Sequence, residues 1–159
     1  KHTLFIFLPH DTRSKEKKFM EELVIKNGLK NEIGKNILIE DVISPKIEKA
    51  ILKDVDLVVT GRMHLAILAL SVCKPVIGLA YNGFKMRGTF RWLNCEDLVI
   101  NDDNQNIINI YHHVITNLKS IRHKISNNSK FAYFGALSPI KEILSYFNSN
   151  VLPNISINS

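Results

Sequence analysis

The chain has 159 residues, a net charge of +6 and 45% apolar residues, which suits a globular domain with its own core. Its basic residues lack the interleaved aromatic residues of single-strand nucleic-acid binders, and no apolar run reaches the ~20 residues of a membrane helix. Because Cys73 and Cys95 have neither metal-binding nor redox spacing, we expect reduced thiols and a cytoplasmic protein, with peripheral contact at the inner membrane face left open.

Short apolar runs bounded by polar or turn residues recur along the chain and are typical of buried parallel strands. The first run is closed by Pro9, and the later ones end at polar or turn residues. In chain order, the predicted strands cover residues 3–8, 36–39, 56–59, 75–80 and 97–100.

Between these strands, apolar residues recur at helical spacing. Ser44 and Pro45 form a helix start, with Ser44 as the N-cap and Pro45 at the first helical position. After the fifth strand, Asp102 or Asp103 is expected to cap a long helix, and another helix is expected beyond Asn127 and Asn128. The predicted helices cover residues 13–26, 45–52, 62–72, 85–93, about 103–118 and 130–147.

Strands that alternate with helices through short connections predict a Rossmann-like, open parallel sheet of about five strands with helices on both faces. We expect this domain to span residues 1–148 and residues 149–159 to form a flexible tail. Ligands of open α/β sheets bind at the edge where the strands end, so candidate site residues should follow strands.

The residues after the third predicted strand favour an anion site. Gly61 lets the backbone approach a ligand closely, and Arg62 supplies a forked cation for phosphate or carboxylate. The first turn of the next helix adds N–H groups that attract anions. His64 lies in that turn, and a histidine that changes charge near neutral pH suits proton transfer.

A second polar turn follows the fourth predicted strand. Tyr81, Asn82 and Gly83 lead to Lys85, and this turn is expected at the same edge as Arg62 and His64. Lys85 is equally well explained as an ordinary surface lysine. Phe90 and Trp92 are expected to pack rather than to contact a sugar.

These residues together resemble the polysaccharide pyruvyl transferase family. The resemblance covers about Leu4 to Leu93 and rests on DLVV, Gly61-Arg62-Met63-His64, Lys74-Pro75-Val76-Ile77-Gly78 and Tyr81 with Lys85; upstream, the first strand with Pro9-His10-Asp11 is also similar. The turn Tyr81-Asn82-Gly83-Phe84-Lys85 differs from the family's compact Tyr-Asp-Pro-Lys turn.

The resemblance implies one half of a GT-B-like fold, the C-terminal domain of an enzyme whose missing N-terminal domain would supply much of the acceptor site. It also implies phosphoenolpyruvate as donor, a sugar or lipid-linked glycan as acceptor, and no cofactor or metal. The implied catalytic residues are Arg62 and His64. The implied substrate-binding residues are Gly61, Arg62, Tyr81, Lys85 and His10.

Two other functions remain open. A GT-B glycosyltransferase that uses a nucleotide sugar is one, although the helix after Arg62 lacks the acidic residue that commonly holds the ribose. The other is a non-catalytic module of glycan assembly that keeps the fold and binds without turnover.

Overall fold

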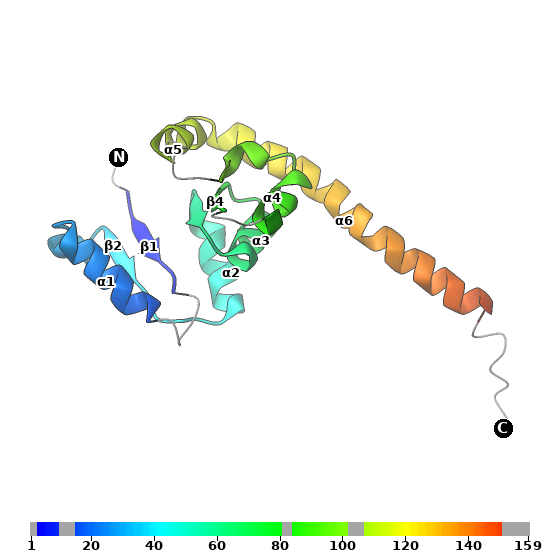
Figure 1. Ribbon diagram of the computed structural model, residues 1–159, viewed down its shortest axis with the longest axis horizontal. Helices are drawn as coiled ribbons and strands as arrows, with labels where there is room; N and C mark the ends of the chain where they lie inside the picture. Colours follow the sequence, from blue (N-terminus) through cyan, green and yellow to red (C-terminus); the bar gives the residue numbers. More distant parts are fainter. Residues whose placement is uncertain (1–2, 10–14, 81–83, 102–106, 151–159) are drawn as a thin grey trace, which may run out of the picture. The chain divides into compact units, whose positions relative to one another are not determined.

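A computed structural model describes residues 3–9, 15–80, 84–101 and 107–150, with side-chain surroundings for all of these except 130–140 and 147–150. The chain divides into two compact units: unit one is Lys1–Ile51 and unit two is Leu52–Ser159. Figure 1 labels the helices and some of the strands of both units.

Unit one contains a small parallel sheet. Its elements are β1 (Phe5–Phe7), α1 (Glu16–Lys26), the short 3₁₀ helix η1 (Lys30–Glu32) and β2 (Ile37–Ile39). Phe5 lies opposite Ile37 and Phe7 opposite Ile39. Val24 of α1 and Ile37 of β2 are buried, so the inner side of the helix and the second strand form the apolar interior of this unit.

Helix α2 (Pro45–Asp54) runs from unit one into unit two. It begins at the predicted proline, and the Ile47 N–H donates to the Ser44 Oγ at 3.5 Å. The predicted N-cap and first helical residue are therefore confirmed.

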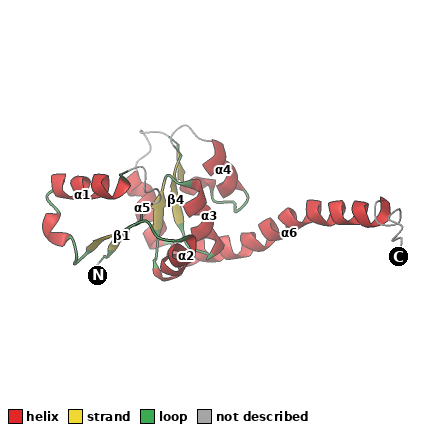
Figure 2. Cartoon of the chain, turned by 90° about the horizontal axis from the view of Figure 1, so that it is seen from below, coloured by secondary structure: helices red, strands yellow, loops and turns green. Residues whose placement is uncertain are grey.

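Unit two contains a second parallel sheet with strand order β3-β4-β5. In Figures 1 and 2, α5 lies on the opposite side of β4 from α3 and α4. The elements are β3 (Val58–Thr60), α3 (Met63–Ser71), β4 (Val76–Leu79), α4 (Phe84–Arg91), the 3₁₀ helix η2 (Glu96–Leu98), β5 (Val99–Ile100), α5 (Ile107–Thr116) and α6 (Leu118–Asn150).

The core of unit two is a single apolar cluster between the sheet and its helices. Val76 and Ile77 of β4 are fully buried, as expected for a central strand covered on both faces. Phe90 of α4, Val114 of α5 and Ile125 of α6 are also completely buried. The helices that flank the predicted site are thus held by the same core as the strands.

The prediction of a single sheet of about five strands needs correction. All five strands form near their predicted positions and the described pairings are parallel, but they pair as two strands in unit one and three in unit two. Apolar runs indicate where strands form. They do not indicate which strands pair with one another through hydrogen bonds. The α/β class with alternating strands and helices is confirmed.

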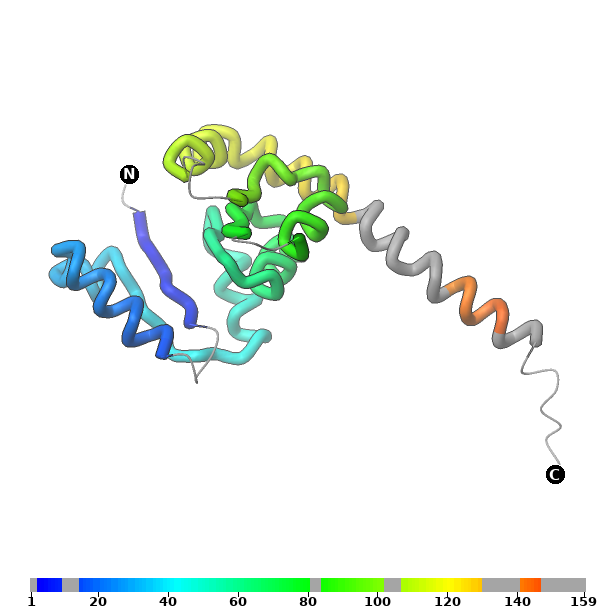
Figure 3. Tube along the Cα trace, in the orientation of Figure 1, coloured from blue at the N-terminus to red at the C-terminus, as the bar shows by residue number. Residues whose placement is uncertain are grey.

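The prediction of a helix break near Asn127 and Asn128 is wrong. Helix α6 continues from Leu118 to Asn150, and the break lies at Asn117 instead. The Asn128 side chain donates to the Leu93 carbonyl at 2.8 Å, so its amide has a partner outside the helix. The Asn117 side-chain amide donates to the His113 carbonyl at 2.8 Å, and the Asn117 backbone N–H donates to the same carbonyl at 3.1 Å, so both groups bond to the last turn of α5. Figure 3 shows the described turns at 141–146 lying apart from the other helices of unit two. All six residues of these turns are exposed.

Candidate functional site

The predicted anion site lies at the end of two neighbouring strands of unit two. Thr60, the last residue of β3, lies opposite Gly78 in the parallel pairing with β4. Gly61 and Arg62 directly follow β3, and Ala80 directly follows β4. Because parallel strands end at the same edge of a sheet, the segments that enter α3 and α4 leave the sheet at one edge.

The start of α3 is suited to an anion. Arg62 is the N-cap residue in an extended conformation, with φ −94° and ψ 114°, and none of the described side chains caps this helix or places an acid in its first turn. The Arg62 N–H donates to the Oγ1 of the buried Thr60 at 2.9 Å, which fixes the backbone before the helix. The following N–H groups of the first turn form a positive helix end with no neighbouring carboxylate on α3.

His64 is the second residue of α3, and both its side chain and that of Arg62 are exposed. The helix start therefore presents a guanidinium and an imidazole to solvent within a single turn. The roles of Arg62 in anion binding and of His64 in proton transfer stay predictions.

Gly61 lies close to the neighbouring strand. A Cβ atom at this position would lie 3.5 Å from the Leu79 carbonyl oxygen and 3.9 Å from the Leu79 Cβ, both ordinary contacts. The described neighbours therefore leave room for a side chain, and close approach to a ligand stays the prediction for this glycine.

Lys85 is exposed in the first turn of α4. The opposite side of the helix is fixed by the buried Met86 and Phe90, which pack against Gly78 of β4. The fold thus brings Arg62, His64 and Lys85 to helix starts at one sheet edge. Tyr81 and His10 lie outside the described residues.

One expectation about the far end of α4 is only half right. Phe90 packs in the core with no exposed surface, but Trp92 is 68% exposed. Phe84, which sequence reasoning did not single out, is 94% exposed. Helical spacing from the buried Met86 and Phe90 could have revealed the outward position of Phe84, because residues 84 and 86 lie roughly 160° apart around the helix.

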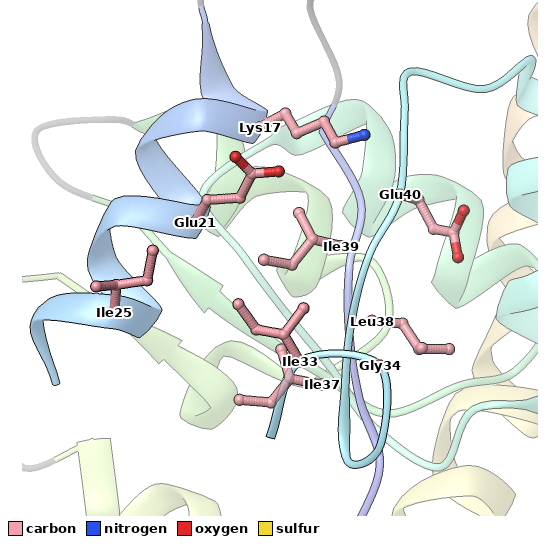
Figure 4. A pocket seen from close by; sticks show the side chains of 9 residues that line it. All are labelled: Lys17, Glu21, Ile25, Ile33, Gly34, Ile37, Leu38, Ile39 and Glu40. Atoms are coloured by element: carbon pink, nitrogen blue, oxygen red, sulfur yellow. The ribbon is translucent and has the colours of Figure 1, made fainter. Parts of the chain in front are cut away.

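The described pocket belongs to unit one, whereas this edge belongs to unit two (Figure 4). It has a volume of about 350 Å³. Its apolar lining is Ile25, Ile33, Ile37, Leu38 and Ile39, and its other lining residues are Gly34, Lys17, Glu21 and Glu40.

The charge of this pocket does not suit an anionic donor. Lys17 donates to Asp41 at 2.7 Å. That hydrogen bond, with added attraction from Asp41, Glu21 and Glu40, raises the pKa of Lys17 above its usual value. Carboxylates thus outnumber the one cation, and the helix start at Arg62 is the better candidate for binding phosphate or carboxylate.

Neither a metal centre nor a membrane-spanning helix is found in the described part of the chain. No three His, Cys, Asp or Glu side chains there group so that they could hold a metal ion. None of the helices searched there is both long and apolar enough to cross a bilayer.

The fold and this edge define an α/β protein in which two parallel strands lead into helix starts at one edge of the sheet. The comparison with family models gives the particular family: a model described as polysaccharide pyruvyl transferase matches residues 2–83, just over half of the chain. The chain belongs to the polysaccharide pyruvyl transferase family. This match confirms the resemblance, includes Arg62 and His64, and ends before Lys85. No curated protein and no solved structure matched the chain.

Proposed function

We propose that the chain transfers the enolpyruvyl group of phosphoenolpyruvate to a sugar diol, forming a pyruvate ketal on a cell-surface glycan. Family membership supports this reaction class. The observation that carries the proposal is the α3 start, where Arg62 and His64 are presented together at the carboxyl edge of β3 and β4. In this proposal the chain forms half of a GT-B-like enzyme and acts in the cytoplasm.

The chemistry requires a proton donor and cations. An acid protonates the methylene carbon of phosphoenolpyruvate, and positive charge develops at the neighbouring carbon. One sugar hydroxyl attacks that carbon and gives up its proton, which restores the acid. The second hydroxyl attacks the same carbon, the bond to phosphate breaks, and inorganic phosphate leaves with the second hydroxyl proton.

We assign His64 to the proton transfer and Arg62 to the phosphate or carboxylate of the donor. A guanidinium forms paired hydrogen bonds with such groups, and the α3 N–H groups add to the attraction. Gly61 and Tyr81 are assigned to substrate binding, and Lys85 or His10 to supporting charge.

Calorimetric titration with phosphoenolpyruvate, UDP and a UDP-sugar tests this proposal. We expect saturable binding of phosphoenolpyruvate that Arg62→Ala weakens by about tenfold or more, the effect of losing a hydrogen bond to a charged group. Lys74→Ala is the matched control, because Lys74 precedes β4 and lies at the opposite edge of the sheet.

Two results would refute the assignment. Equal binding of phosphoenolpyruvate by the parent and Arg62→Ala would remove Arg62 from the donor site. Binding of UDP or the UDP-sugar without any response to phosphoenolpyruvate would instead identify a nucleotide-sugar glycosyltransferase.

A further inference from the structure

Helix α4 has an outward side that the fold does not use. Met86 and Phe90 hold the helix to β4 through Gly78, where an added Cβ would lie only 3.1 Å from the Met86 Cγ. The opposite side is exposed along the helix and the residue that follows it. We call this surface the α4 face: Phe84, Lys85, Arg87, Gly88, Arg91 and Trp92.

The α4 face is strongly basic. Three of the eight residues of α4 are Lys or Arg and none is acidic. Arg91 has a neighbouring acid, Glu96, at 3.6 Å, but its side chain remains 83% exposed. The surface therefore favours a partner that carries negative charge.

The aromatic residues of the α4 face are mostly exposed, and the described residues around them give them no packing role. Phe84 is 94% exposed and Trp92 is 68% exposed. Leaving such large apolar rings in water is unfavourable, and aromatic rings on a surface commonly mark a binding site. The flat faces of these rings suit the apolar C–H face of a sugar ring.

Gly88 lies between these rings on the same side of the helix. A Cβ at this position would have nothing within 4 Å, so packing against the described residues does not require glycine there. Glycine also destabilises a helix interior by about 1 kcal/mol relative to alanine. A flat surface between the two rings is one feature that glycine provides and alanine does not.

We propose that the α4 face binds an acidic glycan, with Phe84 and Trp92 stacking on sugar rings and Arg87 pairing with a carboxylate or phosphate group. The two aromatic residues are eight positions apart, about 12 Å along a helix, so the ligand is an oligosaccharide. The identification of this glycan as the acceptor rests on the proposed function; the binding itself does not.

The arrangement favours a glycan over an anionic membrane. An interfacial helix needs a continuous apolar side that enters the lipid, with charges on the other side. On α4 the charged residues share the outward side with Phe84, and the apolar side is already buried against β4. The α4 face has an aromatic ring at each end and cations between them, which suits a chain of sugar rings that carries acidic groups.

Trp92 is the one tryptophan in the chain, so its fluorescence reports directly on this surface. We would titrate the full chain with hexagalacturonate, and with maltohexaose as the neutral ligand of equal length. The expected result is a saturable change in fluorescence with hexagalacturonate only. Arg87→Glu should weaken binding about tenfold, because reversal both removes an attraction and adds a repulsion, each worth up to about fivefold at an exposed site.

Lys49→Glu is the matched control. It makes the same change in net charge on an exposed residue of α2, outside the α4 face. Far-UV circular dichroism checks that each variant is folded. The proposal is overturned if Lys49→Glu and Arg87→Glu weaken binding equally, if maltohexaose binds as tightly as hexagalacturonate, or if neither sugar changes the fluorescence.

Vesicles of phosphatidylcholine with phosphatidylglycerol provide the remaining comparison. A shift of Trp92 emission to shorter wavelength with these vesicles, without a response to hexagalacturonate, would assign the surface to lipid and overturn the proposal. Phosphoenolpyruvate binding, measured separately by calorimetry, tests the other site. A parent chain that binds hexagalacturonate but not phosphoenolpyruvate would refute the proposed function and leave the α4 face supported.

Discussion

The contact between β4 and α4 depends on the absence of a side chain at Gly78. A Cβ there would lie 3.1 Å from the Met86 Cγ and 3.2 and 3.3 Å from the Phe90 Cζ and Cε2. Favourable carbon contacts are about 3.5–4.0 Å, so both neighbours would have to move by a few tenths of an ångström. Met86 is flexible, but Phe90 has no exposed surface and its ring is enclosed by the core.

We therefore expect Gly78→Ala to destabilise the protein. Overpacking a core costs about 1–3 kcal/mol, whereas replacing a glycine in a strand returns about 0.5–1 kcal/mol of conformational entropy. The middle of these two ranges predicts a net loss of about 1 kcal/mol in the free energy of unfolding, and their extremes predict at most about 2.5 kcal/mol. Urea unfolding followed by far-UV circular dichroism measures it.

Gly88→Ala is the matched control, because it is the same substitution on the opposite side of the helix in open space. It should raise the free energy of unfolding by up to about 1 kcal/mol, since alanine favours a helix. The packing thus predicts that Gly78→Ala lowers the free energy of unfolding and that Gly88→Ala raises it. A Gly78→Ala variant as stable as the parent would refute the described contact between α4 and β4.

Three further predictions concern the same unit. Asn128→Ala should lower the free energy of unfolding by about 1 kcal/mol, because the Leu93 carbonyl loses its 2.8 Å partner; an unchanged urea midpoint would contradict this. Burial raises the pKa of Cys95 from 9.0 to about 11, so at pH 8 a thiol reagent should modify Cys95 only after unfolding. The folded chain then binds this proton more tightly than the unfolded chain, so the free energy of unfolding should fall as pH rises from about 9 towards 11. Phe84→Ala should change stability by less than about 0.5 kcal/mol, because the ring is almost fully exposed; a larger loss in urea unfolding would show that the ring packs.

The local structure follows closely from the sequence. The start of α2 at Ser44 and Pro45 was predicted from residue types alone, because an N-cap hydroxyl and a proline at the first helical position act within one turn. The apolar runs likewise predicted strands near Val58–Thr60 and Val76–Leu79.

The errors arose where distant residues decide the outcome. Asn128 reads as a helix breaker in isolation, but its amide bonds to Leu93, 35 positions earlier, and the helix continues. Trp92 was expected to pack because it is large and apolar. In the structure Phe90 is buried in the core, whereas Trp92 is exposed. The pairing of five strands into two sheets also depends on contacts between segments remote in sequence.

The candidate site was predictable in part for a physical reason. Arg62 and His64 follow a strand and begin a helix, and this local arrangement alone places them at the carboxyl edge of a parallel sheet. The α4 face could not be identified from the sequence, because its residues form no recognisable motif. They become notable once Met86 and Phe90 are known to face inward and Phe84 and Trp92 to be exposed.

The buried side of helix α4 determines the orientation of its exposed side. Gly78 permits the close approach of Phe90, which fixes the rotation of the helix about its axis. Since residues of one helix cannot rotate independently, that buried contact also determines that Phe84 and Arg87 point outward. Lys85 lies in the first turn of the same helix, at the sheet edge that carries Arg62. A substitution at Gly78 that shifts α4 should therefore lower the free energy of unfolding and also weaken binding of an acidic oligosaccharide. It should do so although Gly78 is buried and lies outside the α4 face.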